Sequence, residues 1–189
     1  MPDAIHALFN HPGLRSILVK LRVPLIVGVA IALIVSTDPR WLWPGFILSM
    51  LGELLQFWCF ATLDKNDRLC SSGPYAVVRN PMYLGRFLLI AGALLATGKW
   101  WLLIPFVVLY WFYMVNRVKR EEKRLRGIFG AEYAAYCAAV ERFLPGWRNR
   151  SKPIWIWNAK LLRQNHGDAN LAATLAFWSA VFLWHLPPS

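Results

Sequence analysis

Acidic residues are scarce in this chain of 189 amino acids. Ten Asp and Glu stand against 21 Lys and Arg, which gives a net charge of +11. Charged residues of both signs make up only 16% of the chain, well below the quarter that is usual for soluble domains. Hydrophobic residues reach 57%, and the mean hydropathy is +0.38. This balance argues against an ordinary soluble domain and favours a membrane protein.

Patterns for disulfides, metals and nucleotides are also missing. The three cysteines form no C-x-x-C pair, and the four histidines lack metal-ligand spacing, so we expect free thiols and no zinc site. The chain has no P-loop, no G-x-G-x-x-G after a strand, no H-E-x-x-H and no G-x-S-x-G. We therefore do not expect a soluble-type nucleotide or zinc enzyme on a membrane anchor. No signal peptide is evident in the first 20 residues.

What the chain does have is a series of apolar runs. A bilayer core requires about 20 helical residues, and only the second run is comfortably that long. Residues 84–101 would either span with tilt or local thinning, or form a re-entrant hairpin with the next run. We predict an all-α, multi-pass transmembrane bundle of four to five spans. Its runs are Val23–Thr37, Trp41–Leu63, Leu84–Ala96, Leu102–Val115 and Leu171–Leu186.

The basic residues are distributed unevenly between the two ends of these runs. With the N-terminus inside, 19 of the 21 Lys and Arg fall on the inner side, and only Arg40 and Lys99 fall outside. This asymmetry follows the positive-inside rule and explains the charge through anionic lipid headgroups. No recognition motif for nucleic acid accompanies it. We expect a bacterial cytoplasmic membrane protein, with the lipid bilayer as partner, no nucleic acid, and a cytoplasmic pocket.

Two inner segments carry the residues best suited to chemistry. The first, residues 69–85, places a Ser-Ser-Gly-Pro turn before Arg79, Asn80 and Pro81. Pro81 favours a helix start there, and a helix N-terminus suits anionic groups. The alternative is a capped connection between two spans. Either interpretation makes Pro81 the first residue of a helix.

The second segment, residues 116–130, continues an apolar run as a basic helix. Arg117 and Glu121 are four residues apart and share a face, and Glu122 supplies a second carboxylate that could hold a cationic ligand. The alternative is a surface pair on an interfacial helix. Farther along, Phe129–Val140 carries aromatic residues at helical spacing, which favours a packing face over a ligand site. Glu53, inside the second run, is either functional or hydrogen-bonded to a neighbouring helix or loop.

These segments resemble a known family. The stretches GPYAVVRNPMYLG and RVKREEKRLRGIFGAEYAAYCAAVERFLP, joined by an apolar hairpin, are similar to the isoprenylcysteine carboxyl methyltransferases and phospholipid N-methyltransferases of membranes. The resemblance covers about residues 52–145 of a single domain, 1–189, with an interfacial segment and an extra helix over 146–189. Asn80 stands where the prenylcysteine enzymes usually have His, so prenylcysteine is not assigned as the substrate.

The resemblance implies methyl transfer from S-adenosylmethionine to an apolar or lipid-like acceptor, on oxygen, nitrogen or sulfur. It implies a catalytic role for Arg117 and Glu121, with Arg117 at the acceptor. The rival interpretation is a non-enzymatic membrane scaffold or transport accessory that retains the fold. The cofactor-binding residues predicted from the resemblance and from charge are Asp67, Arg68, Leu69, Cys70, Tyr75, Arg79, Asn80, Pro81, Met82, Tyr83, Glu121 and Glu122.

Overall fold

The structure, a computed structural model, describes residues 12–64, 68–146 and 152–187, and most of these residues are helical. These residues contain no strand, so the all-α prediction is confirmed. The α-helices of this part are α2 (Pro12–Val35), α3 (Leu42–Thr62), α4 (Pro81–Leu95), α5 (Leu103–Ala139), the short α6 (Ala159–Gln164) and α7 (Gly167–Trp184). Short 3₁₀ turns lie at η1 (Pro39–Trp41), η2 (Gly73–Ala76) and η3 (Trp100–Leu102).

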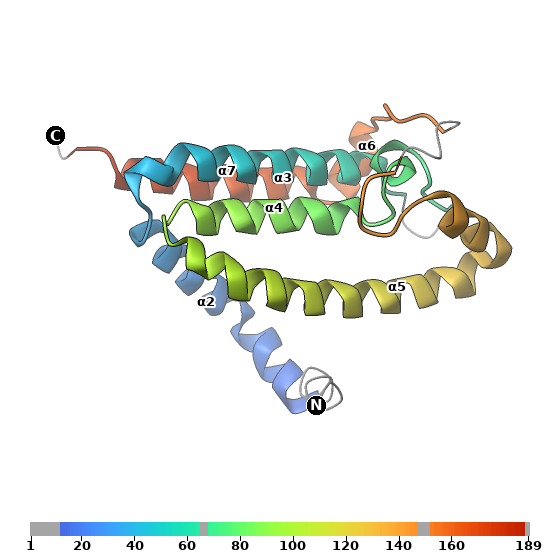
Figure 1. The fold of residues 1–189 in the computed structure, drawn as a ribbon, viewed down its shortest axis with the longest axis horizontal. Coiled ribbons are helices and arrows are strands. Elements are labelled where there is room, and N and C mark those ends of the chain that lie inside the picture. The colour runs from blue at the N-terminus through green and yellow to red at the C-terminus, as the bar shows by residue number, and fades with distance from the viewer. Residues whose placement is uncertain (1–11, 65–67, 147–151, 188–189) are drawn as a thin grey trace.

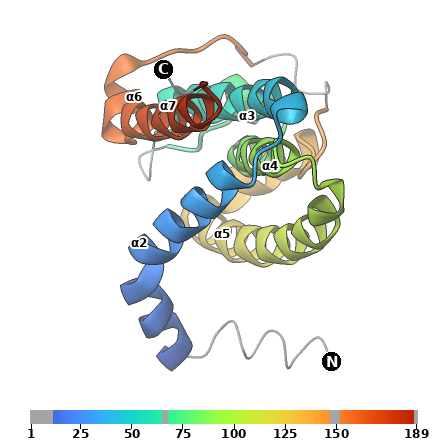
Figure 2. The same cartoon turned by 90° about the vertical axis from the view of Figure 1, so that its left-hand side faces the viewer.

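Helices α3, α4 and α7 form the body of the molecule. Figure 1 shows them side by side, with α5 running along α4 and bowing away from it. Helix α2 leaves the body at an angle and touches it mainly through α7, as Figure 2 shows from the side. The loop between α3 and α4 and the far end of α5 meet at one end of the molecule. The η1 and η3 turns lie at the opposite end.

Helices α3 and α4 pack closely because small residues face one another. A Cβ atom added to Gly45 would lie 2.6 Å from the Gly92 carbonyl oxygen, and one added to Gly52 would overlap the Gly85 carbonyl oxygen. Between these two contacts, the Ser49 hydroxyl donates to the Leu89 carbonyl at 2.8 Å. Small residues that let backbones approach, with a serine bridging two helices, are typical of helix pairs in membranes.

Glu53 joins α3 to α7. Its side chain is fully buried, and its two carboxylate oxygens accept from the Asn170 amide at 2.9 Å each. One oxygen also accepts from the Thr174 hydroxyl at 3.0 Å. A buried carboxylate requires such donors. The interpretation of Glu53 as a hydrogen-bonding residue toward a neighbouring helix is therefore confirmed.

The segment between α5 and α7 returns across the end of α3. Asn165 donates its side-chain amide to the Phe60 and Leu63 carbonyls at 3.0 and 2.7 Å, and so caps the last turn of α3. The Trp155 ring stacks on Trp58 at 5.1 Å. These contacts hold the segment against the end of the molecule at which the α3–α4 loop lies.

Among the residues that the structure describes, two helical stretches are long and apolar enough to cross a membrane, Pro39–Thr62 and Trp100–Ala139. In the apolar window of the second, only 11% of the residues are buried inside the protein. A core helix of a soluble protein would be mostly covered. This stretch instead presents residues such as Ile104 and Leu109 on its surface, as a lipid-facing helix does.

Candidate functional site

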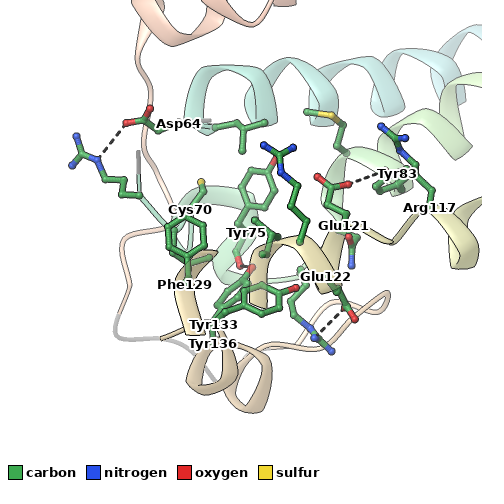
Figure 3. A pocket seen from close by; sticks show the side chains of 18 of the residues that line it. Asp64, Cys70, Tyr75, Tyr83, Arg117, Glu121, Glu122, Phe129, Tyr133 and Tyr136 are labelled. Atoms are coloured by element: carbon green, nitrogen blue, oxygen red, sulfur yellow. Dashed lines mark hydrogen bonds and ion pairs between the residues drawn. The ribbon is translucent and has the colours of Figure 1, made fainter. Parts of the chain in front are cut away.

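A cavity of about 350 Å³ opens where the α3–α4 loop meets α5. That volume lies in the range of small-molecule sites. Three segments line it: the end of α3 with its following loop, the first turns of α4, and α5 from Tyr113 onward. In Figure 3, Asp64 and Cys70 lie at one end of the cavity, and Tyr83 and Arg117 lie at the other.

The loop side of the cavity is held in shape by backbone geometry. Gly73 has φ +63°, a conformation that favours glycine, and a Cβ there would meet the Thr62 side chain at 2.7 Å. The Tyr136 hydroxyl donates to the Tyr75 carbonyl at 2.7 Å, tying the loop to α5. Asn80 has a non-helical backbone and α4 begins at Pro81, as predicted. Gly73 and Pro74 of the Ser-Ser-Gly-Pro turn begin the short η2 helix.

A kink in α5 closes the far wall. Gly130 has φ +49° and ψ −119° inside the helix, a conformation that glycine adopts readily. The end of α5 therefore turns back toward the loop, as Figure 1 shows. Tyr133 and Tyr136 become buried against Val140, which confirms the predicted packing face. With Phe129, the same two tyrosines also line the cavity.

The accessible carboxylate of the site is Glu121. It accepts a hydrogen bond from the Tyr83 hydroxyl at 3.0 Å, and it lies one turn from Arg117 on the same face of α5. The Tyr83 hydroxyl also interacts with Arg117. The Arg86 guanidinium lies 5.9 Å from the centre of the Tyr83 ring. Tyr83 of α4 therefore reaches α5, with its hydroxyl beside the Glu121 carboxylate and the Arg117 guanidinium.

Glu122 lies in a different environment. Its side chain is 7% exposed and binds Arg79 at 3.2 Å. It also pairs with Arg142, whose Nε donates to it at 3.0 Å. Arg79 donates further to the Cys137 sulfur at 2.8 Å. The Nε atom of Arg79 is buried and has no hydrogen-bond partner among the residues that the structure describes.

A thiol, Cys70, and a carboxylate, Asp64, lie at the other end of the cavity. Burial raises the pKa of the Cys70 thiol to about 11, so this sulfur is a neutral thiol near pH 7 and a poor nucleophile. Asp64 pairs with Arg68 at 3.3 Å, but the Arg68 side chain is 82% exposed. Such an exposed pair adds little stability, and the Asp64 carboxylate remains at the edge of the cavity.

Most of the residues predicted for the site come together at this cavity. Pro81 is fully buried and starts α4 without lining the cavity wall, and Asp67 lies outside the described residues. Residues 68–70, which the resemblance assigns to the cofactor site, have an irregular backbone. The predicted residues that line the cavity are Arg68, Leu69, Cys70, Tyr75, Arg79, Asn80, Met82, Tyr83, Arg117, Glu121 and Glu122.

The structure adds residues that the sequence interpretation missed. Tyr113 lies four positions before Arg117 on α5 and lines the cavity, so helical spacing alone could have identified it. Asp64 directly follows the second apolar run and could have been found as its first polar residue. Arg142 carries no such signal, because its pairing with Glu122 depends on how the chain folds back after α5.

Comparison with known proteins agrees with this geometry. The family model described as phospholipid methyltransferase matches residues 42–132. Protein-S-isoprenylcysteine O-methyltransferase of Schizosaccharomyces pombe is 30% identical over 82 residues, covering 43% of this chain and 35% of that protein. Protein-S-isoprenylcysteine O-methyltransferase B of Arabidopsis thaliana is 25% identical over 113 residues, covering 53% and 57%.

A third relative matches over a longer stretch. The cobalt-zinc-cadmium resistance protein CzcN of Cupriavidus metallidurans is 29% identical over 140 residues, covering 70% of this chain and 64% of that protein. The matches thus span between about a third and two thirds of the relatives' own lengths. No solved structure matches the chain.

Fold and site together define a helical protein with membrane-type apolar helices and a small-molecule cavity at one end. Within that class, residues 42–132 match the family model described as phospholipid methyltransferase, and the chain is similar to protein-S-isoprenylcysteine O-methyltransferases. The resemblance predicted from the sequence is confirmed, and the cavity is formed largely by this region.

Proposed function

We propose that the protein is a methyltransferase that uses S-adenosylmethionine and acts on an apolar or lipid-like acceptor at the membrane. The observation that carries the proposal is the accessible Glu121 beside Tyr83 and Arg117, in a cavity formed by the family-like region. The transferred methyl group would go to an oxygen, nitrogen or sulfur atom of the acceptor.

The side chains of the cavity fit this cofactor. S-adenosylmethionine carries an ammonium, a sulfonium and a carboxylate. Glu121 offers an accessible negative charge to the cations, and the rings of Tyr75 and Tyr83 offer aromatic faces. The buried Nε–H of Arg79 lacks a partner among the described residues and suits the carboxylate. Glu122 neutralises two arginines, so it acts toward the cofactor through Arg79.

S-adenosylmethionine, when bound, supplies an electrophilic methyl group. The chain's own residues then contribute placement, which dominates the rate of an in-line displacement. Arg117 holds an anionic head of the acceptor, and Glu121 holds the cationic side of the cofactor. A carboxylate acceptor requires no base, whereas an amine or thiol arrives deprotonated. Cys70 remains a neutral thiol, so no methyl-cysteine intermediate is invoked.

The membrane arrangement follows from the apolar runs and the charges. In this proposal the chain crosses four or five times in a bacterial cytoplasmic membrane, and the cavity faces the cytoplasm. The bulk of the basic residues lie at the cavity end, where anionic headgroups attract them. Arg117 lies about 6 Å closer to the membrane than Glu121 along α5. The acceptor's tail would therefore remain in lipid while its head reaches the cavity.

Calorimetric titration of purified protein with S-adenosylmethionine tests the proposal. Glu121→Gln should weaken binding by about tenfold or more, because a charge-assisted contact is lost. Glu132→Gln is the matched control, since it removes the same charge from an exposed position on the same helix. If both variants bound S-adenosylmethionine with equal affinity, Glu121 would not be a cofactor residue. It would then be a surface residue of an interfacial helix.

A membrane scaffold or transport accessory is the rival function. The match to a protein named for cobalt-zinc-cadmium resistance extends over more of this chain than the matches to the S. pombe and A. thaliana methyltransferases. Absence of S-adenosylmethionine binding by a well-folded wild-type protein would favour this rival. If the protein bound S-adenosylmethionine but transferred no methyl group to any lipid acceptor, the cofactor site would be supported. The proposed class of acceptor would then be wrong.

A further inference from the structure

A second cavity, of about 250 Å³, lies against α5 beside the one already described. Three cations from α5 line it, Lys119, Lys123 and Arg126, and Arg142 joins them from the segment after the helix. Glu122 is the single acid in the lining. We call this cavity the basic groove.

Helical geometry separates the basic groove from the functional cavity. At about 100° per residue, Lys119, Lys123 and Arg126 fall within about 60° of one another around α5. Glu121 lies on the opposite side of the same helix. Glu122 lies at the boundary and contributes to both linings. The basic groove is therefore a different surface from the one proposed to hold the cofactor.

The positive charge of the groove is not neutralised by the described part of the chain. Lys119, Lys123 and Arg126 are exposed, and no ion pair among the described residues involves them. Glu122 is already engaged by Arg79 and Arg142. Arg142 remains 37% exposed while paired. The groove thus presents several cations with no acid available to balance them.

The membrane side of the groove is apolar. The Phe143 ring, next to Arg142, packs on Trp111 at 5.5 Å. Trp111 is 53% exposed and Leu144 is 76% exposed. Trp111 precedes Lys119 by eight residues, or about 12 Å along α5 toward the apolar span. The cations thus lie farther from the apolar span than these exposed apolar side chains do. A phospholipid presents its phosphate and its acyl chains in the same order.

We propose that the basic groove binds an anionic phospholipid. The phosphate lies among Lys119, Lys123, Arg126 and Arg142, and an acyl chain lies on Trp111, Phe143 and Leu144. The lipid is held there and not methylated, because the groove is on the other side of α5 from Arg117 and Glu121. The proposal depends on the membrane setting of the proposed function but not on methyl transfer.

Native mass spectrometry of the detergent-purified protein tests this site. The wild-type chain is titrated with phosphatidylglycerol and, separately, with phosphatidylcholine of the same acyl chains. We expect phosphatidylglycerol to be retained preferentially. The triple variant Lys119→Gln, Lys123→Gln, Arg126→Gln should reduce that retention by about tenfold or more, since each basic residue near a lipid headgroup contributes substantially.

A matched control removes the same charge elsewhere. Lys152→Gln, Lys160→Gln and Arg163→Gln together neutralise three exposed basic residues outside the groove and should leave retention unchanged. Lys123→Glu alone serves if the triple variant is unstable, and should also lower retention. These readouts need neither S-adenosylmethionine nor turnover, so their failure is distinct from failure of the proposed function.

Three outcomes would overturn the proposal. Equal retention of both lipids would show that the groove does not recognise an anionic headgroup. Equal loss in the control variant would indicate general charge attraction rather than a site. Displacement of the lipid by millimolar inorganic phosphate would identify a free-anion site, in which the apolar side chains contribute nothing.

Discussion

At the scale of single residues, two adjacent carboxylates have different environments. Glu121 is exposed and meets the Tyr83 hydroxyl, whereas Glu122 is buried between Arg79 and Arg142. Successive residues on a helix point about 100° apart, so neighbours in sequence can face different surroundings. The sequence interpretation assigned both acids to the cofactor, because the partner Arg142 comes from a segment whose course could not be predicted.

Glu122→Gln should destabilise the protein strongly. The substitution leaves the mostly buried Arg79 guanidinium without its counter-charge, and loss of one partner from a buried pair costs about 3 kcal/mol. Thermal unfolding in detergent, followed by tryptophan fluorescence, should show a clear drop in Tm. Glu121→Gln is the neighbouring control and should shift Tm little. A Glu122→Gln protein as stable as the wild type would mean that the two arginines find other partners.

Arg117→Lys should separate the acceptor role from the cofactor role. A lysine keeps the charge but loses the planar, bidentate geometry that suits a carboxylate or phosphate head. We expect reduced turnover with S-adenosylmethionine affinity largely unchanged, and Arg163→Lys as a control should alter neither. Loss of cofactor binding in a folded Arg117→Lys protein would assign Arg117 to the cofactor instead. Normal turnover would leave it as an interfacial arginine.

At the scale of elements, the close contact between α3 and α4 positions the functional cavity. The cavity is lined by the end of α3 and the start of α4, so the spacing of these helices determines its width. That spacing depends on glycine backbones in mutual contact. A side chain introduced there would have to push the two helices apart.

Gly52→Leu should therefore destabilise the protein and impair ligand binding together. Overpacking a tight contact typically costs about 1–3 kcal/mol, and here the obstacle is the Gly85 backbone. Gly28→Leu is the matched control, because nothing lies within 4 Å of a Cβ at that position in α2. Thermal unfolding and cofactor titration measure both effects. Equal behaviour of the two variants would show that α4 can move away at little cost.

The helices themselves were largely predictable, and their irregularities were not. Apolar runs predicted α3, α4, α5 and α7, and Pro81 predicted where α4 begins. The kink at Gly130 was not predicted, because the sequence around a glycine in a helical pattern does not indicate whether that glycine will adopt a positive φ. The predicted aromatic packing face was correct, yet its second use as a cavity wall depends on that kink. Tertiary contacts, rather than local propensity, determined these features.

At the scale of the whole molecule, the positive charge is concentrated at one end. The cavity, the basic groove and the segment after α5 share that end, whereas Arg40 and Lys99 lie near the η1 and η3 turns at the other. The sequence predicted this separation from the order of apolar runs and charges. Which end faces the cytoplasm, and how many helices cross, remain predictions.

Cysteine labelling in intact cells tests the orientation. Lys99→Cys should react with a membrane-impermeant maleimide added outside, because its turn is predicted to face out. Lys160→Cys should react only after the cells are opened. The wild-type chain, with Cys59, Cys70 and Cys137 as free thiols, provides the background. If position 160 but not position 99 were labelled in intact cells, the topology would be the reverse of the predicted one.

The bond between Glu53 and α7 has a consequence for biosynthesis. Asn170 follows Glu53 by 117 residues, and at the usual pace of translation that separation lasts on the order of 10 s. During this interval α3 has left the ribosome while the donors for its carboxylate have not yet been made. The nascent chain must therefore keep Glu53 hydrated, or shielded by the insertion machinery, until α7 arrives. Release of the chain before α7 would leave the Glu53 carboxylate without its donors, so α7 completes the surroundings of a residue made 117 positions earlier.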